Sequence, residues 1–369
     1  MNNREPLRVV DLYRSAAELP PDVLQLLCDH EQTTLQFGPD WWQNLEAQVF
    51  ANHPGRAYYV LRAAGVAVAV LPLLLSGGAF YRRANALGNY YTCLYEPALA
   101  KGLDAATLSQ LFVAVRRHAG SLHRLTLAPM DPESPAFATV ERALALAGFG
   151  SERYFCFGNW YLQAPHSWAD YLAGRDGKLR STLKRMKQRL ATDGGHAEII
   201  VDGADVERGI AAYEVVYAKS WKVPEPSPGF MPGLMRLCAA RGAMRLGLVW
   251  LNGQPIAAQF WIVAHGRAEI YKLAYDEAFK SHSPGTVLTA HMLQHVLEED
   301  RVQEVDYLIG DDPYKKNWMS HRRERWGLVG YNRRSPLGLA MLLGARMKKV
   351  VKPWVLRLRP GKPAVSTSA

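Results

Sequence analysis

One predicted helix start has the composition of an anion-binding site. Ser283 and Pro284 are good N-cap and first-turn residues, so a helix is expected to begin there. The backbone N–H groups of Gly285, Thr286 and Val287 would then lie unpaired in its first turn, where the helix dipole adds positive potential. Gly285 also lets a ligand come close. These residues predict a phosphate or pyrophosphate site, and the alternative is an ordinary helix cap.

A loop further along the chain concentrates reactive side chains. Residues 310–318 follow a predicted strand at residues 304–309 and contain two carboxylates, a phenol, two amines and an indole. Polar residues collected at the end of a strand are typical of a functional site. The loop supplies four candidate residues, Asp311, Tyr314, Lys315 and Trp318.

The order of these motifs resembles a known family. A strand reading YxxxYD, a helix opening with SPGxxL, and a strand with DxxxG followed by YKxxW are similar to the GNAT-type domain of cellulose- and exopolysaccharide-associated acetyltransferases (CelD-type). The pattern also resembles Fem-type aminoacyltransferases, which carry tandem GNAT folds. The resemblance covers residues 155–330, including a basic helix at residues 180–190 and the Trp221-Lys222 pair. Residues 1–154 match more loosely, through Leu71-Pro72-Leu73 and residues 87–97.

The resemblance implies two GNAT-like halves, of which the second is catalytic and the first degenerate. The donor would be an acyl thioester at the helix beginning with Ser283, with acyl-CoA as a substrate and no permanently bound cofactor. The acceptor would be an amine or hydroxyl of a saccharide or cell-envelope precursor. The Q/R-x-x-G-x-G/A loop of typical GNAT enzymes is missing from the second half of the sequence, which leaves acetyl-CoA, a longer acyl-CoA and an aminoacyl-tRNA open as donors. Because residues 197–244 contain no sustained heptads for a Fem-type arm, acyl-CoA is favoured.

Acyl transfer needs a base, a group that stabilises the oxyanion and an acid for the leaving thiolate. We expect Asp311 to act as base, Tyr314 as acid, and Lys315 to stabilise the oxyanion or a donor phosphate, with Asp276 as a further candidate carboxylate. The residues expected to bind the donor are Ser283, Gly285, Thr286, Val287 and Lys272. Those expected to bind the acceptor are Trp221, Lys222, Arg180, Lys184 and Trp318. The alternative is that these side chains only cap or pair locally.

Alternating strands and helices are expected to position these residues. In the first half we expect strands at residues 57–62, 65–75 and 122–127 and helices at residues 105–119 and 134–147. In the second half we expect helices at residues 178–190 and 205–220, a loop at 223–233, and strands at 197–201, 244–251, 254–264 and 267–275. A faint similarity between residues 65–75 and 253–263 suggests a duplicated fold. The predicted class is α/β (α+β in some schemes), with tandem GNAT-like folds that are each a mixed, mostly antiparallel sheet flanked by helices.

Length and composition set the remaining limits. A chain of 369 residues suggests two domains, which we place at residues 1–154 and 155–334, followed by a tail at 335–369. The net charge of +10 is carried by the second part, because residues 1–154 hold 13 Lys and Arg against 14 Asp and Glu. This asymmetry indicates an anionic ligand or membrane face, or serves solubility alone. Four scattered cysteines and no visible signal segment predict a cytoplasmic protein.

The tail and the basic helix leave several partners open. Residues 335–359 read as a basic amphipathic helix, which would lie peripherally on an anionic inner membrane or dock on the protein itself, with residues 360–369 disordered. The basic helix at residues 178–190 would grip an acidic acceptor or donor phosphates, or is a solvated face. A tRNA-dependent transferase and a non-catalytic subunit of a polysaccharide-synthesis assembly remain alternatives, although nucleic acid is not the favoured partner. His291 and His295 lack an HExxH pattern, so no metal is expected, and the oligomeric state is left open.

Overall fold

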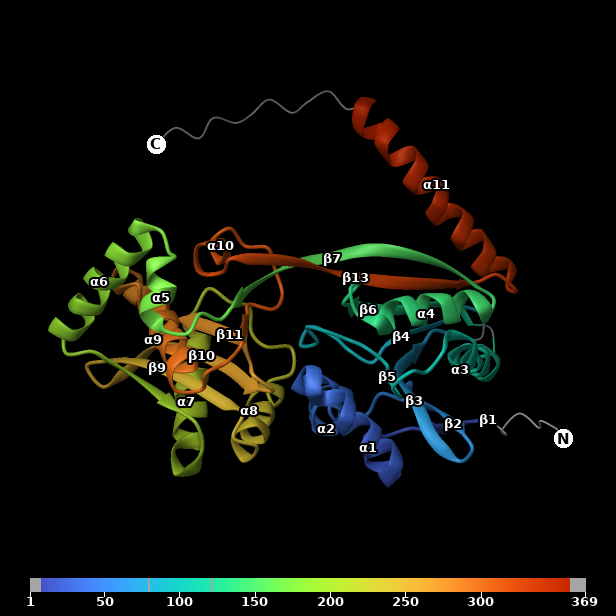
Figure 1. The fold of residues 1–369 in the computed structure, drawn as a ribbon, viewed down its shortest axis with the longest axis horizontal. Helices are drawn as coiled ribbons and strands as arrows, with labels where there is room; N and C mark the ends of the chain where they lie inside the picture. The colour runs from blue at the N-terminus through green and yellow to red at the C-terminus, as the bar shows by residue number, and fades with distance from the viewer. Residues whose placement is uncertain (1–7, 79, 121, 359–369) are drawn as a thin grey trace.

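A single sheet of 13 strands runs through both halves of the molecule. The computed structural model describes residues 8–78, 80–120 and 122–358. Its strand order is β1-β2-β3-β4-β6-β13-β7-β12-β11-β10-β9-β8, and β5 pairs with β3 beside this path (Figure 1). The strands are β1 (Arg8–Tyr13), β2 (Arg56–Ala63), β3 (Val66–Ser76), β4 (Arg82–Ala86), β5 (Ala98–Leu99), β6 (Leu122–Met130), β7 (Phe149–Gln163), β8 (His196–Ile200), β9 (Met244–Leu251), β10 (Gln254–Ala264), β11 (Arg267–Tyr275), β12 (Glu304–Asp306) and β13 (His321–Asn332).

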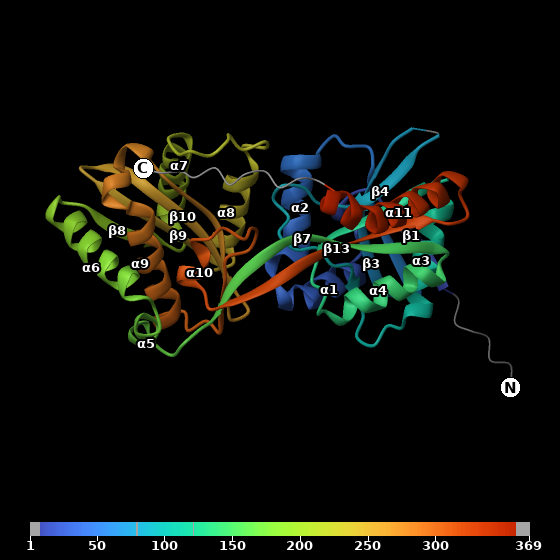
Figure 2. The same ribbon diagram turned by 90° about the horizontal axis from the view of Figure 1, so that it is seen from above.

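Helices cover both faces of this sheet. The α-helices are α1 (Pro21–His30), α2 (Pro39–Leu45), α3 (Ala105–His118), α4 (Pro135–Leu146), α5 (Trp168–Ala173), α6 (Gly177–Thr192), α7 (Val206–Ala218), α8 (Phe230–Ala240), α9 (Pro284–Glu298), α10 (Lys315–Trp318) and α11 (Pro336–Leu358). In the second half α5, α6 and α9 lie on one face, whereas α7 and α8 lie on the other (Figure 2).

The two halves repeat one arrangement. Each contains an antiparallel hairpin, β2–β3 or β9–β10, followed by a strand that pairs in parallel with a later one. The parallel pairs are β4 with β6, connected through α3, and β11 with β12, connected through α9. Since all other pairs in the sheet are antiparallel, the predicted tandem, mostly antiparallel architecture is confirmed.

Two long antiparallel strands connect the halves. β13 lies between β6 and β7, so the chain returns from the second half into the first (Figures 1 and 2). His321 pairs with Tyr161 near the second half, and Asn332 pairs with Phe149 in the first. The expected boundary between residues 154 and 155 falls inside β7. The sheet therefore continues without interruption through that position.

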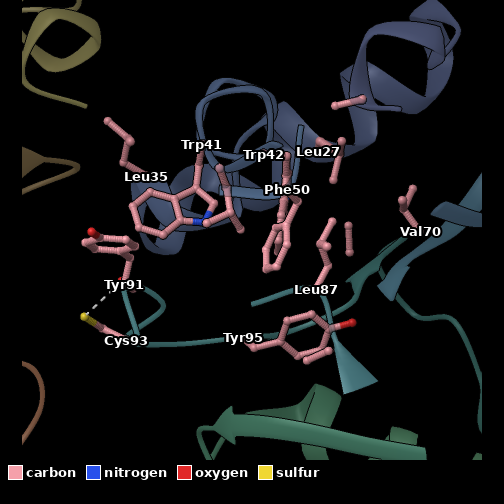
Figure 3. Packing of buried hydrophobic residues seen from close by; sticks show 14 of the residues in the cluster. Leu27, Leu35, Trp41, Trp42, Phe50, Val70, Leu87, Tyr91, Cys93 and Tyr95 are labelled. Atoms are coloured by element: carbon pink, nitrogen blue, oxygen red, sulfur yellow. Dashed lines mark hydrogen bonds between the residues drawn. The ribbon is translucent and has the colours of Figure 1, made fainter. Parts of the chain in front are cut away.

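The apolar core also continues from one half into the other. Trp41 and Trp42 on α2 are buried together with Leu35, Phe50 and Tyr95 from other helices and loops of the first half (Figure 3). Phe230 of α8 stacks on Tyr91 with 4.0 Å between ring centroids, and Trp41 meets the edge of the same Phe230 ring at 5.5 Å. Because aromatic side chains bury large areas, these contacts fix α8 against the first half.

Most predicted elements are present, two need correction, and one long strand was not predicted. β9, β10 and β11 have the expected bounds, and Asn252 and Gly253 form the left-handed turn between the first two. The strand expected at residues 304–309 ends at Asp306, because the Asp306 carboxylate accepts the N–H of Leu308, whose φ is 52°. The loop expected at residues 223–233 is shorter because α8 already begins at Phe230. β13 had no counterpart among the expected elements.

The last described helix, α11, leaves the first half at an angle (Figure 1). Leu342 anchors it, with an exposed fraction of 3%, against Gly150 of β7. Arg346 and Lys349 form ion pairs with Glu152. Among the described helices none is long and apolar enough to cross a membrane. Residues 360–369, which were expected to be disordered, lie outside the described residues.

Candidate functional site

A cavity forms where two parallel strands separate. β11 and β12 pair over three residues only, from Arg267 opposite Glu304 to Glu269 opposite Asp306. β11 then continues to Tyr275, whereas the segment that follows β12 turns away from it. The first turn of α9 lies at the opening between them. The cavity has a volume of about 730 Å³. Its walls include Lys178, Leu179, Trp221, Gln259, Leu273, Tyr275, Ser283, Gly285, Thr286, Thr289, Tyr307, Tyr314, Asn317 and Trp318. We call it the donor cavity.

The first turn of α9 is capped differently from the sequence expectation. Ser283 adopts the left-handed conformation, with φ 47°, and its side chain makes no capping hydrogen bond. The N–H groups of Thr286 and Val287 donate to the Ser283 carbonyl at 3.0 and 3.1 Å, so the expectation that they are free is wrong. Of the three N–H groups expected to be free, those of Gly285, Thr286 and Val287, only the Gly285 N–H has no acceptor within the described part of the chain. A Cβ at Gly285 would lie 3.3 Å from the Tyr275 ring, so a larger residue would require this ring to shift.

A buried hydrogen-bond network holds this helix start in place. The Gln259 amide donates to the Gly285 carbonyl at 3.1 Å and to the Thr289 hydroxyl at 2.7 Å. Its own carbonyl oxygen accepts the Trp261 indole N–H at 3.0 Å. Buried polar groups that are fully paired fix a local geometry. Gln259 was not among the expected site residues, because a single polar residue in an apolar strand gives no motif.

A second cavity, of about 350 Å³, adjoins the donor cavity at the junction of the two halves. The two cavities share Trp221, Leu273, Tyr307 and Tyr314. The first half adds aromatic walls, and the second half adds lysines and Asp312. The remaining lining residues are Tyr90, Tyr91, Cys93, Lys222, Ile270, Tyr271, Lys272, Leu308, Ile309, Asp312 and Lys315. We call this the acceptor cavity.

The three lysines of the acceptor cavity differ in their partners. Lys272 forms an ion pair with Glu225 at 2.9 Å and lies 4.3 Å from the centroid of the Tyr90 ring. Lys315 donates to the Gly310 carbonyl at 3.3 Å and pairs with Asp312 at 3.3 Å. Burial and the nearby positive charge of Lys272 lower the pKa of Lys222 to about 8. Lys222 therefore loses its proton more readily than an ordinary lysine.

Tyr314 stands where the two cavities meet. Its ring contacts Tyr307 edge-on, with 5.9 Å between centroids, and its side chain remains 43% exposed. Burial, with a smaller contribution from Asp312, raises the pKa of Tyr314 to about 12. The phenol therefore stays protonated at neutral pH and is available as a donor to either cavity.

The structure brings many, but not all, of the expected residues together. Ser283, Gly285, Thr286, Trp221, Tyr314 and Trp318 line the donor cavity. Lys222, Lys272 and Lys315 line the acceptor cavity, so Lys272 lies away from the helix start that it was expected to assist. Val287, Arg180 and Lys184 line a third cavity on other faces of α9 and α6.

Two expected carboxylates line neither the donor nor the acceptor cavity. Asp311 forms an ion pair with Arg322 at 2.7 Å and accepts the Trp160 indole N–H at 2.7 Å. The Arg322 hydrogen bond lowers the pKa of Asp311. Asp276 accepts the N–H of Ala278 at 3.0 Å and lies 3.7 Å from the ammonium group of Lys219. Asp311 and Asp276 are therefore paired with neighbouring groups and line neither of the two cavities.

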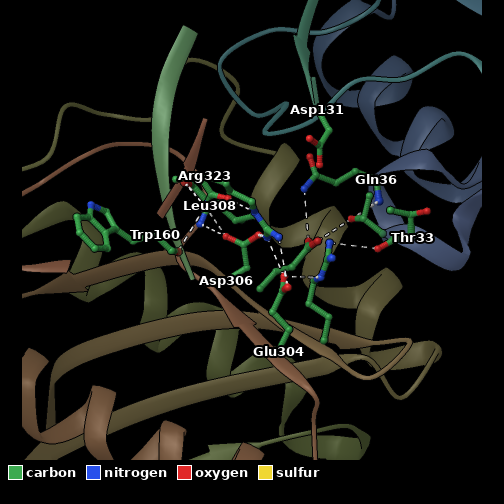
Figure 4. Close-up of polar contacts among 12 residues, drawn as sticks. Thr33, Gln36, Asp131, Trp160, Glu304, Asp306, Leu308 and Arg323 are labelled. Carbon is green, nitrogen blue, oxygen red and sulfur yellow. Dashed lines mark hydrogen bonds and ion pairs between the residues drawn. The ribbon is translucent and has the colours of Figure 1, made fainter. Parts of the chain in front are cut away.

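A polar network behind the cavities fixes β12 against the first half (Figure 4). Asp306 forms an ion pair with Arg323 and accepts from the Asn159 amide at 2.5 Å. Thr34 of the first half donates to Glu269 on β11 at 2.7 Å. Although Asp306 is buried, the charges of Arg323 and Arg325 keep its pKa low. These contacts join the two halves directly beneath the site.

Three side chains at the acceptor cavity were not predicted from the sequence. Tyr90, Tyr91 and Glu225 belong to the acceptor cavity or its ion pairs, yet none was among the expected site residues. Tyr90 and Tyr91 stand within residues 87–97, which carried the weaker part of the resemblance. Paired aromatics beside a glycine-containing turn were the available signal.

Comparison with known families identifies the second half. Residues 177–316 match the family described as "Acetyltransferase (GNAT) domain". This segment is similar to GNAT-type acetyltransferase domains. The matched segment includes α6, the cavity-lining part of α9 and the loop that carries Tyr314. The match stops at Lys316, before β13.

Solved structures resemble the whole chain in fold. FemX is 11% identical, with a TM-score of 0.57, over 82% of this chain and 93% of that one. The C-terminal domain (DUF2156) of a protein named as a lysylphosphatidylglycerol synthetase from Agrobacterium fabrum is 13% identical, with a TM-score of 0.54, over 91% and 97%. A search of curated proteins finds no match. At these identities the similarity concerns the fold alone.

Proposed function

We propose that the protein transfers an acyl group from acyl-CoA to an amine or hydroxyl acceptor. One observation carries this proposal: Tyr314 lines both the cavity at the start of α9 and the cavity between the halves. A thioester held in the first cavity and a nucleophile held in the second would meet at this side chain. The GNAT match of residues 177–316 supports the same class of chemistry.

In the proposed reaction the acceptor attacks the thioester carbonyl carbon. The new C–N or C–O bond forms, the C–S bond breaks, and the acceptor proton passes to the neutral amine of Lys222. The Tyr314 phenol donates to the leaving thiolate. Asp311, which was expected to be the base, takes no part in this scheme because it is paired with Arg322 and lines neither cavity.

The walls of the acceptor cavity suggest a class of acceptor. Tyr90, Tyr91 and Tyr307 offer aromatic faces, on which the C–H surfaces of a sugar ring can pack. Lysine side chains next to these faces suit polar or anionic substituents. We therefore propose a saccharide or cell-envelope precursor as acceptor, modified on an amine or a hydroxyl.

Tyr314→Phe tests the proposal most directly. Loss of a general acid typically lowers the rate by about 10²-fold or more, so we expect thiol release from acetyl-CoA to fall by that factor. Tyr154→Phe, on β7 away from both cavities, is the matched control and should keep its rate. Unchanged turnover in Tyr314→Phe, with donor binding intact in calorimetry, would refute the assignment.

Two alternatives share the same cavities and are distinguished by the same assays. An aminoacyl-tRNA donor is the alternative that the fold similarity to FemX favours. Transfer from charged tRNA, with no binding of acetyl-CoA or longer acyl-CoAs, would favour it. A non-catalytic subunit would bind a donor without releasing thiol from any of the acceptors supplied.

We further propose that α11 gives the protein a peripheral contact with an anionic membrane. Leu339, Leu343 and Met347 follow one another at four-residue spacing and are 41%, 52% and 63% exposed. Lys348 is exposed beside this stripe. Apolar residues next to cations on one helix suit the interface of an anionic bilayer.

A further inference from the structure

A third cavity, of about 440 Å³, lies on faces of α6 and α9 that do not line the donor cavity. α6 turns Lys178, Leu179 and Thr182 toward the donor cavity but Arg180, Lys184 and Lys187 toward the third one. The two cavities have no lining residue in common. A ligand in the third cavity would therefore occupy a site of its own.

The floor of the third cavity is apolar. It is built by residues from α5, α6 and α9, namely Trp168, Leu172, Leu183, Leu190, Val287 and Ala290. Its volume falls within the range of about 300–1,000 Å³ that is usual for small-molecule sites. Such a floor suits an aliphatic chain, because burying each CH₂ group contributes about 0.8 kcal/mol.

The rim of the same cavity is cationic and carries no acidic residue. Arg180, Lys184 and Lys187 line it, and within the described chain none of the three forms an ion pair or a side-chain hydrogen bond. Arg180 and Lys184 are four residues apart on α6, so they repel each other along the helix. An anion bound between them would relieve this repulsion.

His291 lines the rim as an uncharged hydrogen-bonding group. It is half-buried, and burial together with the charge of Lys187 lowers its pKa, so its imidazole is neutral at neutral pH. His196, from the start of β8, also lines the cavity. The cavity thus combines an apolar floor with cationic side chains from α6 and imidazoles from α9 and β8.

We propose that this third cavity binds an anionic amphiphile, a single aliphatic chain that carries a phosphate or carboxylate head. The chain lies on the apolar floor, and the head lies between Arg180, Lys184 and Lys187. This site goes beyond the proposed acyl transfer and does not depend on it. The same chemistry is offered by a soluble acyl phosphate or fatty acid and by a lipid in a membrane.

Calorimetry on the full chain tests the site with octyl phosphate as the probe, below its micellar concentration. Inorganic phosphate and octyl glucoside serve as probes that lack the chain or the charge. We expect octyl phosphate to bind at least tenfold more tightly than either, because both parts of the cavity must be filled. Equal binding of octyl glucoside would overturn the role of the cationic rim, and equal binding of phosphate would overturn the role of the floor.

Substitutions in the third cavity test where octyl phosphate binds. Lys184→Gln/Lys187→Gln should weaken octyl phosphate binding by about tenfold or more, since charge-assisted contacts are lost. Arg185→Gln, on the same helix but outside the cavity lining, is the matched control and should change it less than twofold. Ala290→Phe should block the floor, and its melting curve would establish that it folds. An equal loss in Arg185→Gln would overturn the site.

Two further experiments distinguish a soluble amphiphile from a membrane lipid and from a nucleic acid. Binding to phosphatidylglycerol vesicles without binding of soluble octyl phosphate would contradict an enclosed site and favour surface association. An RNA that binds through Lys184 and Lys187 while octyl phosphate does not bind would assign the rim to nucleic acid. Unaltered thiol release in Ala290→Phe is the expected result, because this site is separate from acyl transfer.

Discussion

The two halves of the molecule share a strand arrangement but differ at one helix start. In the first half α3 follows Asp104, whose carboxylate accepts the Thr107 N–H at 2.9 Å and its hydroxyl at 2.8 Å. In the second half α9 follows Ser283, whose side chain caps nothing. The equivalent helix starts therefore differ. A carboxylate caps the first turn of α3, whereas no side chain caps the first turn of α9.

This difference supports the proposal that only the second copy binds an anionic donor. The Asp104 carboxylate already occupies the position where a phosphate would meet the helix dipole, and its charge would repel one. At α9 the Gly285 N–H and the neutral Ser283 face a cavity of about 730 Å³. We propose that the charged cap, together with the closed core around this helix start, leaves the first half without a donor site.

The first half retains a supporting role. It supplies Tyr90 and Tyr91 to the acceptor cavity, and its Thr34 holds Glu269 beneath the site. α11 also packs on strands that belong mainly to this half. The comparison thus predicts that changes in the second half affect chemistry and donor binding, whereas changes in the first affect stability and attachment.

The largest expected effect is on turnover in Lys222→Met. If the neutral amine accepts the acceptor proton, its loss should lower thiol release by about 10²-fold. Because the pKa of Lys222 is lowered to about 8, wild-type turnover should rise between pH 7 and 9 and then level off. The pH profile of Lys222→Met should lack this rise.

A matched change in the first half controls for loss of charge. Lys101→Met removes an exposed lysine in the turn before α3 and should keep both the rate and the pH profile.

The lowered pKa of Lys222 also affects stability. Between pH 8 and about 10.4 the folded chain binds fewer protons at Lys222 than the unfolded chain does. As the pH rises through this range, the free energy of unfolding of wild type should therefore increase relative to that of Lys222→Met. A rate profile shared by Lys222→Met and wild type would remove Lys222 from the proposed reaction.

Ser283→Asp carries the capping residue of the first half into the second. A carboxylate at the start of α9 should repel donor phosphates and weaken CoA binding by at least tenfold, which corresponds to ~1.4 kcal/mol. Ser283→Asn has nearly the same shape without the charge and tolerates the left-handed backbone, so it should bind CoA nearly as well as wild type. Undiminished CoA binding in Ser283→Asp, measured by calorimetry, would contradict the explanation given for the two halves.

Local patterns predicted the second half well because its signals lie within single elements. Alternating residues bounded by Asn252-Gly253 determine β9 and β10, and Pro284 determines the start of α9. β13 could not be predicted in the same way, since its place between β6 and β7 depends on pairing with strands far away in the sequence. Site residues followed the same rule: Gly285 and Tyr314 were predicted from their own motifs, whereas Tyr90 reaches the acceptor cavity only through the packing of the two halves.

The environment of Asp311 illustrates a different limit. Its loop position was predicted correctly as rich in polar residues, but the sequence could not reveal that Arg322 on β13 lies beside it. A carboxylate is available as a base only if no cation already holds it. That partner comes from a strand that the sequence did not predict.

A smaller effect is expected from α11. Leu339→Gln/Leu343→Gln/Met347→Gln should reduce co-sedimentation with phosphatidylglycerol vesicles by about fivefold, because the apolar stripe would no longer insert. CoA binding should be unchanged, because α11 packs on the first half. Ala340→Gln, on the same exposed part of the helix but outside the stripe, is the control. Equal sedimentation of the triple variant and wild type would remove the membrane proposal.

The smallest expected effect is on stability in the first half. Asp104→Ala removes the cap of α3, so the N–H of Thr107 loses its acceptor and Tm should fall by about 2 °C. Asp104→Asn keeps an oxygen in the same position and should melt close to wild type. Neither variant should acquire a second CoA site, because the Thr107 side chain and the surrounding core still close this helix start; Thr107 is only 7% exposed. A second CoA equivalent bound by Asp104→Ala would mean that the carboxylate alone suppresses a site in the first half, and the two copies would then differ by one charge and not by the shape of their cavities.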